Sequence, residues 1–528
     1  MSGRFYLTTA IFYPSPAPPL HSLFEAIGAD VLVRYHRLLG EETRFLTGMD
    51  EHSARVERLA REHETEPQEL VDGWAANWRS GFDHFGISYD RFIRTTDPDH
   101  VRASTEMVRR AMERGDIYKG RYEGWYCTGD NEFKTEAQLV DGRCPDHPTL
   151  ELQWLEEENY FFRLSAYQER LEALYRDDPS FCEPEHFRNE VLGWLREGLR
   201  DFSISRAGTS WGIPFPGDPD HRIYVWFDAL TNYLTGAGFP DDPDAFARWW
   251  PADEHVIGMN ITRFHCLYWP AMLMSAGLEL PRQVFAHGFM TLRGEKMSKT
   301  RGNVIEPADA EALFGVDGVR YLVLREIPFD KGGDMTLEGL VRRYNAELAN
   351  DLGNFVNRTV SMAGRYLQGN LPPLPGDPLA AAADRELRAA AERAVAAYRA
   401  AIVQLHFDEA LAAVIDLTRA ANGYAESQAP WTLNKEGRRA RVGEVLAVMT
   451  EACRVLGHLM APFTPVAARA IHEQLGIEVA YDARGAGGSG LEALLAWGAE
   501  AGERRTGSAR PIFPRIEAPA PVAGEPLP

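Results

Sequence analysis

The sequence has few cysteines, no long apolar run and fewer positive than negative charges. Five cysteines in 528 residues are too few for a disulfide framework. No apolar run is long enough to span a bilayer, and the first residues lack the apolar stretch of a signal peptide. These features predict a cytoplasmic protein that does not insert into membranes.

The charge balance and composition narrow the class of protein further. Lysine and arginine number 56 and aspartate and glutamate 77, so the formal net charge is −21. Such an acidic chain is a poor non-specific nucleic-acid binder, although a local basic groove stays open. Hydrophobic residues make up 45% and charged residues 25%, which excludes a wholly disordered chain. At about 150 residues per domain, the length predicts roughly three domains.

The amino-terminal half has the pattern of an α/β domain. A β-prone segment, a Pro-rich loop, apolar residues at helical spacing and a second β-prone segment follow one another, which favours a parallel, doubly wound sheet. The pattern resumes after residue 222. The region 116–221 between the two parts holds three of the five cysteines and many aromatics and is interpreted as an insertion. The predicted strands are 5–8, 43–46, 223–226, 255–258 and 283–286.

From about residue 340 the sequence becomes helical. Apolar residues recur every three or four positions, which predicts helices that bury one face in a bundle. The first predicted face comprises Phe407, Leu411, Val414 and Thr418, and the second comprises Leu446, Met449, Cys453, Leu456 and Met460. The Gly-rich stretch 484–490 is predicted as a loop and the Pro/Ala-rich end, 518–528, as a disordered tail.

One motif carries chemistry by its residue types. Lys296-Met297-Ser298-Lys299-Thr300 follows a predicted strand, and glycines flank it. Two lysines three residues apart in such a loop can bind a polyphosphate and neutralise the charge that develops as pyrophosphate leaves. A solvated basic turn is the simpler explanation of the lysines by themselves.

The whole string resembles the KMSKS signature of class I aminoacyl-tRNA synthetases, and the rest of the chain resembles the methionyl-tRNA synthetase family. The matching strings are FYLTT at 5–9, GMDEH at 48–52, NYFFR at 159–163, YVWFDA at 224–229, LGNFVNR at 352–358 and FPRIE at 513–517. The resemblance implies a class I Rossmann-type catalytic domain with a zinc-knuckle connective insertion, followed by an all-α anticodon-binding-type bundle. It also implies an AMP-forming ligase that uses ATP and Mg²⁺.

The resemblance suggests domain boundaries. We place the catalytic domain at 1–115 and 222–325, the connective insertion at 116–221, a stem-contact linker at 326–345, the bundle at 346–480 and a C-terminal loop and tail at 481–528. The appended tRNA-binding module of the family is not recognisable in the sequence, which favours a monomer.

The family's amino-acid pocket maps onto this chain. The implied substrate-binding residues are Ala10, Ile11, Tyr13, Asp50, Trp226, Leu230, Tyr233, His265 and Trp269. Aromatic rings and one imidazole suit a flexible, polarisable apolar side chain, and Asp50 matches the carboxylate that holds the substrate ammonium. Arg206 matches an arginine of the activation site. Core packing is the alternative explanation for each aromatic residue alone.

The motif that should follow the Pro-rich loop is altered. The family's HIGH motif places histidines at a helix N-terminus, where backbone N–H groups favour phosphates. Pro19-Leu20-His21-Ser22 stands there instead, and His21 replaces a glycine that lets ATP lie near the backbone. We retain His21 as a candidate catalytic residue with Lys296, Ser298, Lys299 and Arg206.

Two further departures lie on the same side of the cleft. Met259-Asn260 replaces the family's Lys-Asp after Ile-Gly, and Ser53 replaces the glycine after Asp-Glu-His. Because these losses cluster while the pocket and the lysine loop persist, we interpret them as a changed reaction or acceptor. Decay of the activity and simple tolerance of the changes are the alternatives.

The zinc knuckle of the family is recognisable but altered. The implied ligands are Cys127, Asp130, Cys144 and His147, in the pattern Cys-x-x-Asp and Cys-x-x-His. Zinc accepts carboxylate oxygen as well as sulfur and nitrogen, so all four can bind a structural Zn²⁺. A zinc-free knuckle held by packing is the alternative.

Three bundle residues match positions that read the anticodon in the family, namely Asn354, Arg358 and Trp431. An aromatic ring and an arginine suit stacking on single-stranded bases. The alternative is that they persist as part of the bundle structure.

Three hypotheses of function follow. The first is an amino-acid-activating enzyme of specialised metabolism that transfers the aminoacyl group to a small N-hydroxylated amine, with a separate cupin protein as partner. The second is a methionine–tRNA ligase that charges tRNA. The third is a non-catalytic sensor of an amino acid or RNA.

Overall fold

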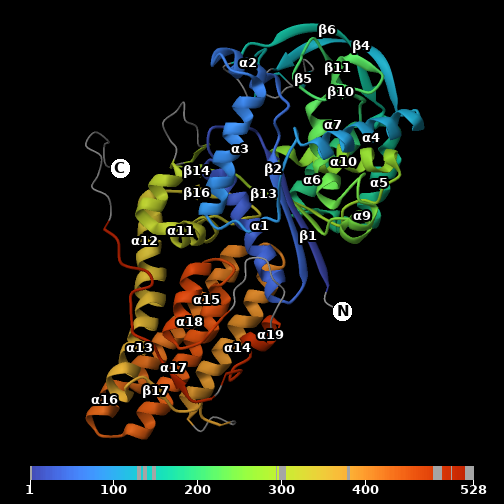
Figure 1. Ribbon diagram of the computed structural model, residues 1–528. Helices are drawn as coiled ribbons and strands as arrows, with labels where there is room; N and C mark the ends of the chain where they lie inside the picture. The colour runs from blue at the N-terminus through green and yellow to red at the C-terminus, as the bar shows by residue number, and fades with distance from the viewer. Residues whose placement is uncertain are drawn as a thin grey trace.

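The computed structural model describes residues 3–127, 132–134, 139–145, 150–292, 294–296, 305–376, 381–479, 490–500 and 502–517. Figure 1 shows an α/β part in its upper half and a helix bundle below it, so the predicted order of the two fold classes is confirmed.

A six-stranded parallel sheet forms the centre of the α/β part. Its strands, in spatial order, are β3 (Arg91–Arg94), β2 (Glu42–Met49), β1 (Arg4–Phe12), β12 (Glu254–Gly258), β13 (Val284–His287) and β7 (Cys182–Glu183). The chain builds outward from β1 through β2 to β3, crosses to the opposite edge at β7, and then adds β12 and β13 between β1 and β7. The strand order therefore reverses between β1 and β12, where open α/β sheets bind ligands at the carboxyl ends of their strands.

Four of the five predicted strands are confirmed, and the strand at 223–226 is wrong. Ile223 is the last residue of β11 (Asp218–Ile223), and helix α7 (Val225–Leu230) begins two residues later. Every residue of α7 is buried. A helix buried on all sides has no amphipathic period, so its apolar run cannot be distinguished from a buried strand.

Helices connect the strands and cover the sheet. The predicted first helix is α1 (Leu20–Leu38), which links β1 to β2, while α2 (Ala54–Glu62) and α3 (Pro67–His84) lead to β3. Helix α4 (Pro98–Arg114) packs against α8 (Asn232–Ala237) and α10 (Trp269–Ala276). Helix α9 (Pro243–Trp249) precedes β12.

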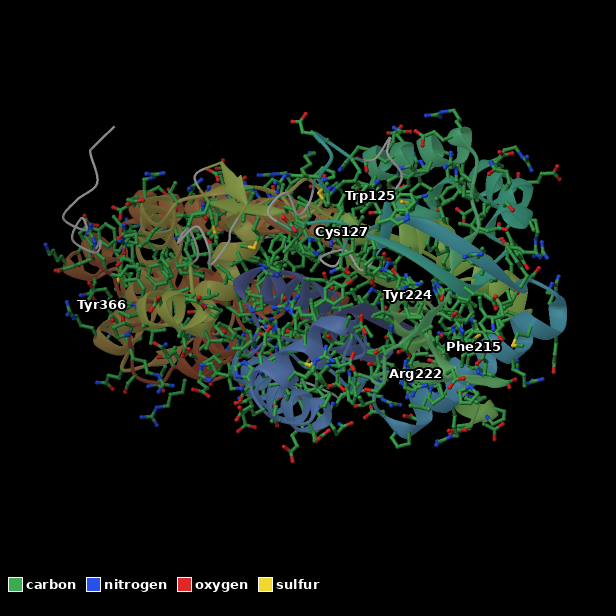
Figure 2. The ribbon with its side chains drawn as sticks, turned by 90° about the horizontal axis from the view of Figure 1, so that it is seen from above. Trp125, Cys127, Phe215, Arg222, Tyr224 and Tyr366 are labelled. Atoms are coloured by element: carbon green, nitrogen blue, oxygen red, sulfur yellow. The ribbon has the colours of Figure 1, made fainter. Side chains whose placement is uncertain are left out.

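The region 116–221 forms two small antiparallel sheets beside the parallel one. The first has the order β5 (Glu132–Lys134), β4 (Ile117–Cys127), β6 (Gln153–Phe162) and β8 (Phe202–Ser203), and the second has β10 (Pro214–Phe215), β11 and β9 (Ser205–Ala207). Trp125 and Cys127 lie near the end of β4, and Phe215 and Arg222 lie on the second sheet (Figure 2). In the sequence between β6 and β8, helices α5 (Gln168–Asp177) and α6 (Glu185–Glu197) flank β7, which extends the parallel sheet. The domain boundaries stay a prediction.

The chain then leaves the sheet and enters the bundle. After β13 comes a three-stranded sheet of β15 (Glu295–Lys296), β14 (Met290–Leu292) and β16 (Gly333–Met335), and the first long helix, α11 (Pro307–Glu326), lies between β15 and β16 in the chain. The helices that follow β15 are α11, α12 (Leu337–Arg343), a π-helix at Tyr344–Gly353, α13 (Asn354–Leu367), α14 (Ala382–Ile402), α15 (Phe407–Gln428), α16 (Pro430–Lys435), α17 (Arg439–Met460), α18 (Pro465–Gln474) and α19 (Leu491–Leu495).

Both predicted faces of the bundle are confirmed. All residues of the first face lie buried on α15, and all residues of the second lie buried on α17. Strand β18 (Arg504–Arg505) returns to pair with β17 (Asn370–Leu371), so part of the predicted C-terminal loop packs on the bundle. In the part of the chain that the structure describes, no helix combines the length and apolarity needed to cross a membrane. The tail at 518–528 and most of the Gly-rich loop lie outside the described residues.

Candidate active site

A cavity of about 420 Å³ opens at the carboxyl ends of β1, β2, β12 and β13, next to the reversal of strand order. Nine residues predicted as site residues line it, namely Ala10, Ile11, Tyr13, His21, Asp50, Trp226, Leu230, Tyr233 and His265. They come from the end of β1, the start of α1, the loop after β2, helices α7 and α8, and the segment after β12. Tertiary structure thus brings most of the predicted pocket into one place.

Tyr233 and His265 form the polar part of the aromatic wall. The Tyr233 hydroxyl lies 2.6 Å from Nε2 of His265, and Nδ1 of His265 lies 3.0 Å from the carbonyl oxygen of Ile261. Because a carbonyl only accepts, Nδ1 carries the proton and Nε2 accepts from the tyrosine. Burial lowers the pKa of His265 to about 4, so the ring is neutral at neutral pH. A neutral imidazole, together with a tyrosine hydroxyl that already donates its proton to that imidazole, suits an uncharged, weakly polar substrate side chain.

Trp226 is a further aromatic residue of the pocket lining. Its ring stacks on Phe264 with centroids 3.6 Å apart, and Tyr13 meets it edge-on at 6.4 Å. The Nε1–H of Trp226 is buried and has no hydrogen-bond partner among the described residues. A buried donor without a partner is costly, which indicates that a ligand acceptor completes this wall.

Asp50 is one of the ionisable residues that line the cavity, together with Glu25 and Arg55. Its side chain is almost fully buried, and one carboxylate oxygen, Oδ1, has no partner in the described part of the structure. The backbone N–H of His52, two residues further along the chain, favours the ionised form of this carboxylate. Burial, reinforced by the nearby carboxylates of Asp228 and Glu51, raises the pKa of Asp50 well above its ordinary value. A buried carboxylate with a free oxygen fits a cationic ligand such as an ammonium group.

Asn232 is a pocket residue that the sequence analysis missed. Its Nδ2 donates to the carbonyl oxygen of Ala229 at 2.7 Å, which leaves its buried Oδ1 without a partner among the described residues. Asn232 directly precedes Tyr233, so its position beside a predicted pocket residue is the signal that could have found it.

A buried acid and imidazole, also missed, line the other end of the cavity. His287 is the last residue of β13, and its Nε2 lies 2.9 Å from the carboxylate of Glu25 on α1. The second Glu25 oxygen accepts from the backbone N–H of Ala10 at 3.1 Å. Burial raises the pKa of Glu25. A histidine at the carboxyl end of a predicted parallel strand is the signal that could have found this pair.

The altered motif opens helix α1 at the rim of this cavity. Pro19 is the residue before the helix and provides no side-chain cap, and Ser22 is buried while His21 is exposed. Pro19, His21 and Ser22 all line the cavity, as does Asn260. The first turn of α1 therefore directs its backbone N–H groups toward this end of the cavity, which favours an anion there.

Two predicted site residues lie outside the cavity lining. Trp269 is fully buried behind Tyr233, with ring centroids 5.7 Å apart, and supports the wall from outside. Arg206, on β9, packs its guanidinium over Tyr224 at 4.0 Å and donates to Ser203 Oγ at 2.8 Å. Tyr224 directly precedes α7, so Arg206 contacts the base of the helix that presents Trp226.

The lysine loop begins just beyond the cavity wall. Phe289 and Met290 line the cavity, and the hairpin of β14 and β15 follows, with the Lys296 backbone in β15. The Lys296 side chain, Ser298 and Lys299 lie outside the described residues, so their roles stay predictions.

The zinc prediction is only half covered by the structure. Cys127 and Cys144 are both fully buried, whereas Asp130 and His147 lie outside the described residues. Among the described residues, no group of three or more histidine, cysteine or acidic side chains is arranged to hold a metal ion. Two buried thiols are compatible with half of a structural zinc site.

The three predicted RNA-binding residues gather on the bundle. Asn354 and Arg358 lie one turn apart on α13, and the Arg358 guanidinium lies 5.5 Å from the ring centre of Trp431 on α16. Asn354 is exposed, and Arg358 and Trp431 are half-buried. An arginine over an indole at a partly open surface is a platform on which a base can stack.

Comparison with known proteins decides the family. The family described as "tRNA synthetases class I (M)" matches residues 5–154 and 149–360, and the "anticodon binding domain of methionyl tRNA ligase" matches 374–494. The methionine–tRNA ligase of Thermosynechococcus vestitus is 42% identical over 533 residues, covering 100% of both chains. That of Mycobacterium tuberculosis strain CDC 1551 is 46% identical over 89% of this chain and 92% of its own. This chain belongs to the class I methionyl-tRNA synthetase family.

A solved structure supports the assignment. The methionyl-tRNA synthetase of Mycobacterium tuberculosis in complex with methionyl-adenylate superposes with a TM-score of 0.90 and 44% identity, covering 97% of this chain and 100% of that one. The predicted fold class and the AMP-forming ligase class are thereby confirmed. The methionyl-tRNA synthetase family uses ATP and Mg²⁺ and typically carries structural Zn²⁺, as the resemblance implied.

Proposed function

We propose that this chain is a methionine–tRNA ligase, which activates methionine with ATP and transfers the aminoacyl group to tRNA. The observation that carries the proposal is the cavity that joins an unpartnered Asp50 oxygen to a neutral Tyr233–His265 wall. The carboxylate supplies the charge that an amino acid's ammonium requires, and the wall suits a thioether. Relatives named for this activity, which match this chain over its whole length, support it.

The chemistry assigns a role to each part of the cavity. The methionine carboxylate attacks the α-phosphate of ATP, the bond to the β-phosphate breaks, and pyrophosphate leaves with its electron pair. Backbone N–H groups at the start of α1 face the phosphates, and Lys296 and Lys299 neutralise the leaving pyrophosphate. A tRNA hydroxyl then attacks the acyl carbon and AMP departs. Asn354, Arg358 and Trp431 bind the anticodon.

The acceptor is the point on which the three hypotheses differ. The anticodon-binding match and the Arg358–Trp431 platform favour tRNA. The comparisons provide no support for a small amine acceptor or a cupin partner, so the first hypothesis gives way to the second. Zinc at the knuckle, a cytoplasmic location, a monomeric state and the domain boundaries remain part of this proposal, and the zinc content of the purified protein tests the first of these.

The test is methionine-dependent exchange between ATP and pyrophosphate, followed by charging of tRNA. We expect exchange with methionine, charging of initiator or elongator tRNA for methionine, and loss of exchange in Asp50→Asn, which keeps the shape but not the charge. Asp83→Asn, at an exposed position near the carboxyl end of α3, is the matched control. Exchange without charging of tRNA would favour the first hypothesis, in which a small molecule accepts the aminoacyl group. No exchange with any amino acid would favour the third hypothesis, a non-catalytic sensor.

A further inference from the structure

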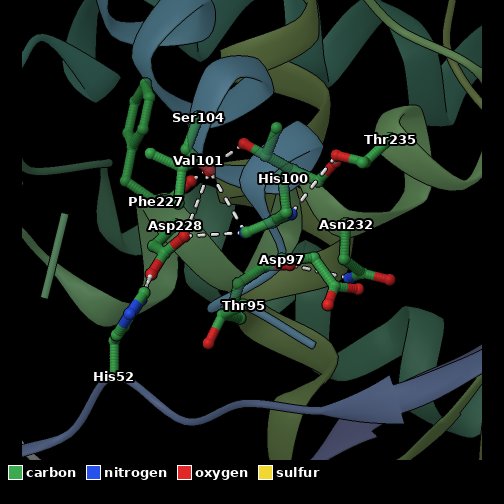
Figure 3. A network of polar contacts seen from close by, with 12 residues as sticks. His52, Thr95, Asp97, His100, Val101, Ser104, Phe227, Asp228, Asn232 and Thr235 are labelled. Atoms are coloured by element: carbon green, nitrogen blue, oxygen red, sulfur yellow. Dashed lines mark hydrogen bonds and ion pairs between the residues drawn. The ribbon is translucent and has the colours of Figure 1, made fainter. Parts of the chain in front are cut away.

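A buried polar network lies directly behind Asp50 and has no role in the proposed function. Its central residue is Asp228, a fully buried residue of α7. Oδ2 of Asp228 lies 2.7 Å from Nδ1 of His52, and Oδ1 lies 2.7 Å from Nε2 of His100 on α4 (Figure 3). The Ser104 hydroxyl donates to the same Oδ1 at 3.0 Å. One carboxylate thus joins α7, α4 and the loop after β2.

The network connects to Asp50 through a single residue. His52 follows Asp50 by two residues, and its backbone N–H favours the ionised form of the Asp50 carboxylate, while its side chain is held by Asp228. The ring of Trp211 meets His52 edge-on at 5.4 Å, and Nε1 of Trp211 donates to the carbonyl oxygen of Glu51 at 2.7 Å. Asp228 and Trp211 therefore both fix the ring of His52, and with it the short loop that carries Asp50.

Three neighbouring carboxylates, those of Asp50, Glu51 and Asp228, differ in their hydrogen-bond partners. Glu51 receives Arg94 Nε and the Thr96 hydroxyl at 2.6 and 2.5 Å, and Asp228 receives two imidazoles and a serine. Burial raises the pKa of Asp228, but the charges and hydrogen bonds of His52 and His100 outweigh it and hold the pKa well below its ordinary value. Of the three, Asp50 is the carboxylate that keeps an oxygen without a partner among the described residues.

We propose that Asp228 is a positioning residue that acts through His52 to aim Asp50 at the substrate ammonium. Trp226 and Leu230, which line the pocket, lie on the same helix as Asp228. Asp228 therefore sets the distance between the group that holds the ammonium and the wall that holds the side chain. This inference rests on the proposed function, because it takes methionine as the ligand.

Replacing Asp228 has two effects on the affinity for methionine. They act in opposite directions, so the measured affinity shows which of them is larger. The negative charge of Asp228 disfavours the ionised form of Asp50, and removing only that charge would strengthen ammonium binding. An asparagine, however, has one acceptor oxygen and cannot accept from both imidazoles, so one of them loses its partner. If positioning dominates, Asp228→Asn weakens methionine binding by about tenfold, the effect of losing one hydrogen bond to a charged group.

The experiment measures the affinity of the full-length protein for methionine and for the methionine analogue that lacks the α-amino group. The variants are Asp228→Asn and His52→Phe, which retains the ring against Trp211 and the backbone N–H. Thr418→Val, which removes a buried hydroxyl from α15 in the bundle, is the control for general loss of packing. Thermal unfolding of each variant shows that it is folded.

We expect both variants to bind methionine about tenfold more weakly and the analogue with unchanged affinity, because only the ammonium uses Asp50. Equal weakening for the two ligands would reduce the network to a structural role and overturn the inference, as would stronger methionine binding by Asp228→Asn. If the unaltered protein does not bind methionine, the proposed function itself fails, and this result differs from both of the others.

Discussion

Arg320 joins the α/β part of the molecule to the bundle, and Arg320→Met tests how firmly the two are held together. Arg320 lies on α11 and is fully buried. Its Nη2 donates to Asp30 on α1 at 2.7 Å and to the Pro462 carbonyl at 3.0 Å. Nε donates to the Phe463 carbonyl at 2.8 Å, and Nη1 donates to that of Phe85 at 3.0 Å. One guanidinium therefore ties α1, the end of α3 and the turn after α17.

The structure sets the size of the expected loss. Methionine fills the space of the arginine stem, so the loss comes from polar groups rather than from a cavity. Asp30 keeps Arg34 at 2.6 Å and the Ser88 hydroxyl at 2.5 Å, but the backbone carbonyls lose their donor. Removing one partner of a buried ion pair costs about 3–5 kcal/mol. The four hydrogen bonds at about 1 kcal/mol each give a similar value.

The assay is urea unfolding followed by tryptophan fluorescence, with the exposed pair Arg102–Asp241 as control. That pair is 2.5 Å long but its side chains are 55% and 42% exposed, against 0% for both members of Arg320–Asp30. Arg102→Met should leave the unfolding curve unchanged, because solvent screens exposed pairs. Arg320→Met should lower the unfolding free energy of the whole protein or separate the two parts into distinct transitions. A change below about 1 kcal/mol with a single transition would refute the reasoning.

Three further predictions concern the site and the bundle. Between pH 6.5 and 4 the protein should lose stability, because the unfolded histidine binds a proton that the buried ring of His265, with its pKa of about 4, does not bind. His265→Gln should reduce this loss of unfolding free energy by up to about 3 kcal/mol. Unfolding curves at both pH values measure the difference. Trp431→Ala should raise the KM for tRNA about tenfold through lost base stacking, with pyrophosphate exchange run in parallel to verify folding; an unchanged KM would leave Trp431 a structural residue. Restoring the family motif by Pro19→His, His21→Gly and Ser22→His should raise exchange at least about tenfold through new phosphate contacts; an unchanged rate would mean that the altered motif is tolerated.

Much of the fold could be predicted from short stretches of sequence. The β-prone segments at 5–8, 43–46, 255–258 and 283–286 became buried strands, and the three-and-four spacing on α15 and α17 marked faces that are buried. These predictions succeed because alternation and helical periodicity are local properties that burial on one face imposes on a sequence. Val225–Leu230 escaped them because a helix buried on every side has no such period.

The residues of the candidate site likewise include some that the sequence predicted and some that it did not. Motifs pointed to Asp50, Tyr233 and His265, and all three line one cavity. Asn232 and the pair Glu25–His287 were missed because they lie outside the motifs, and adjacency to Tyr233 or to the end of a predicted strand is a weak signal by itself. Glu25 and His287 are separated by most of the catalytic region, and only the parallel pairing of strands brings them within 2.9 Å.

The sequence by itself determined the order of the elements, the faces that they bury and the family to which the chain belongs, since these depend on residue types at short or regular spacings. Tertiary structure alone decided which polar groups meet: Asp228 with His52 and His100, and Arg320 with Asp30. The reason is physical. A buried charge must find partners wherever the packed chain supplies them, and those partners lie at sequence separations that no local pattern records.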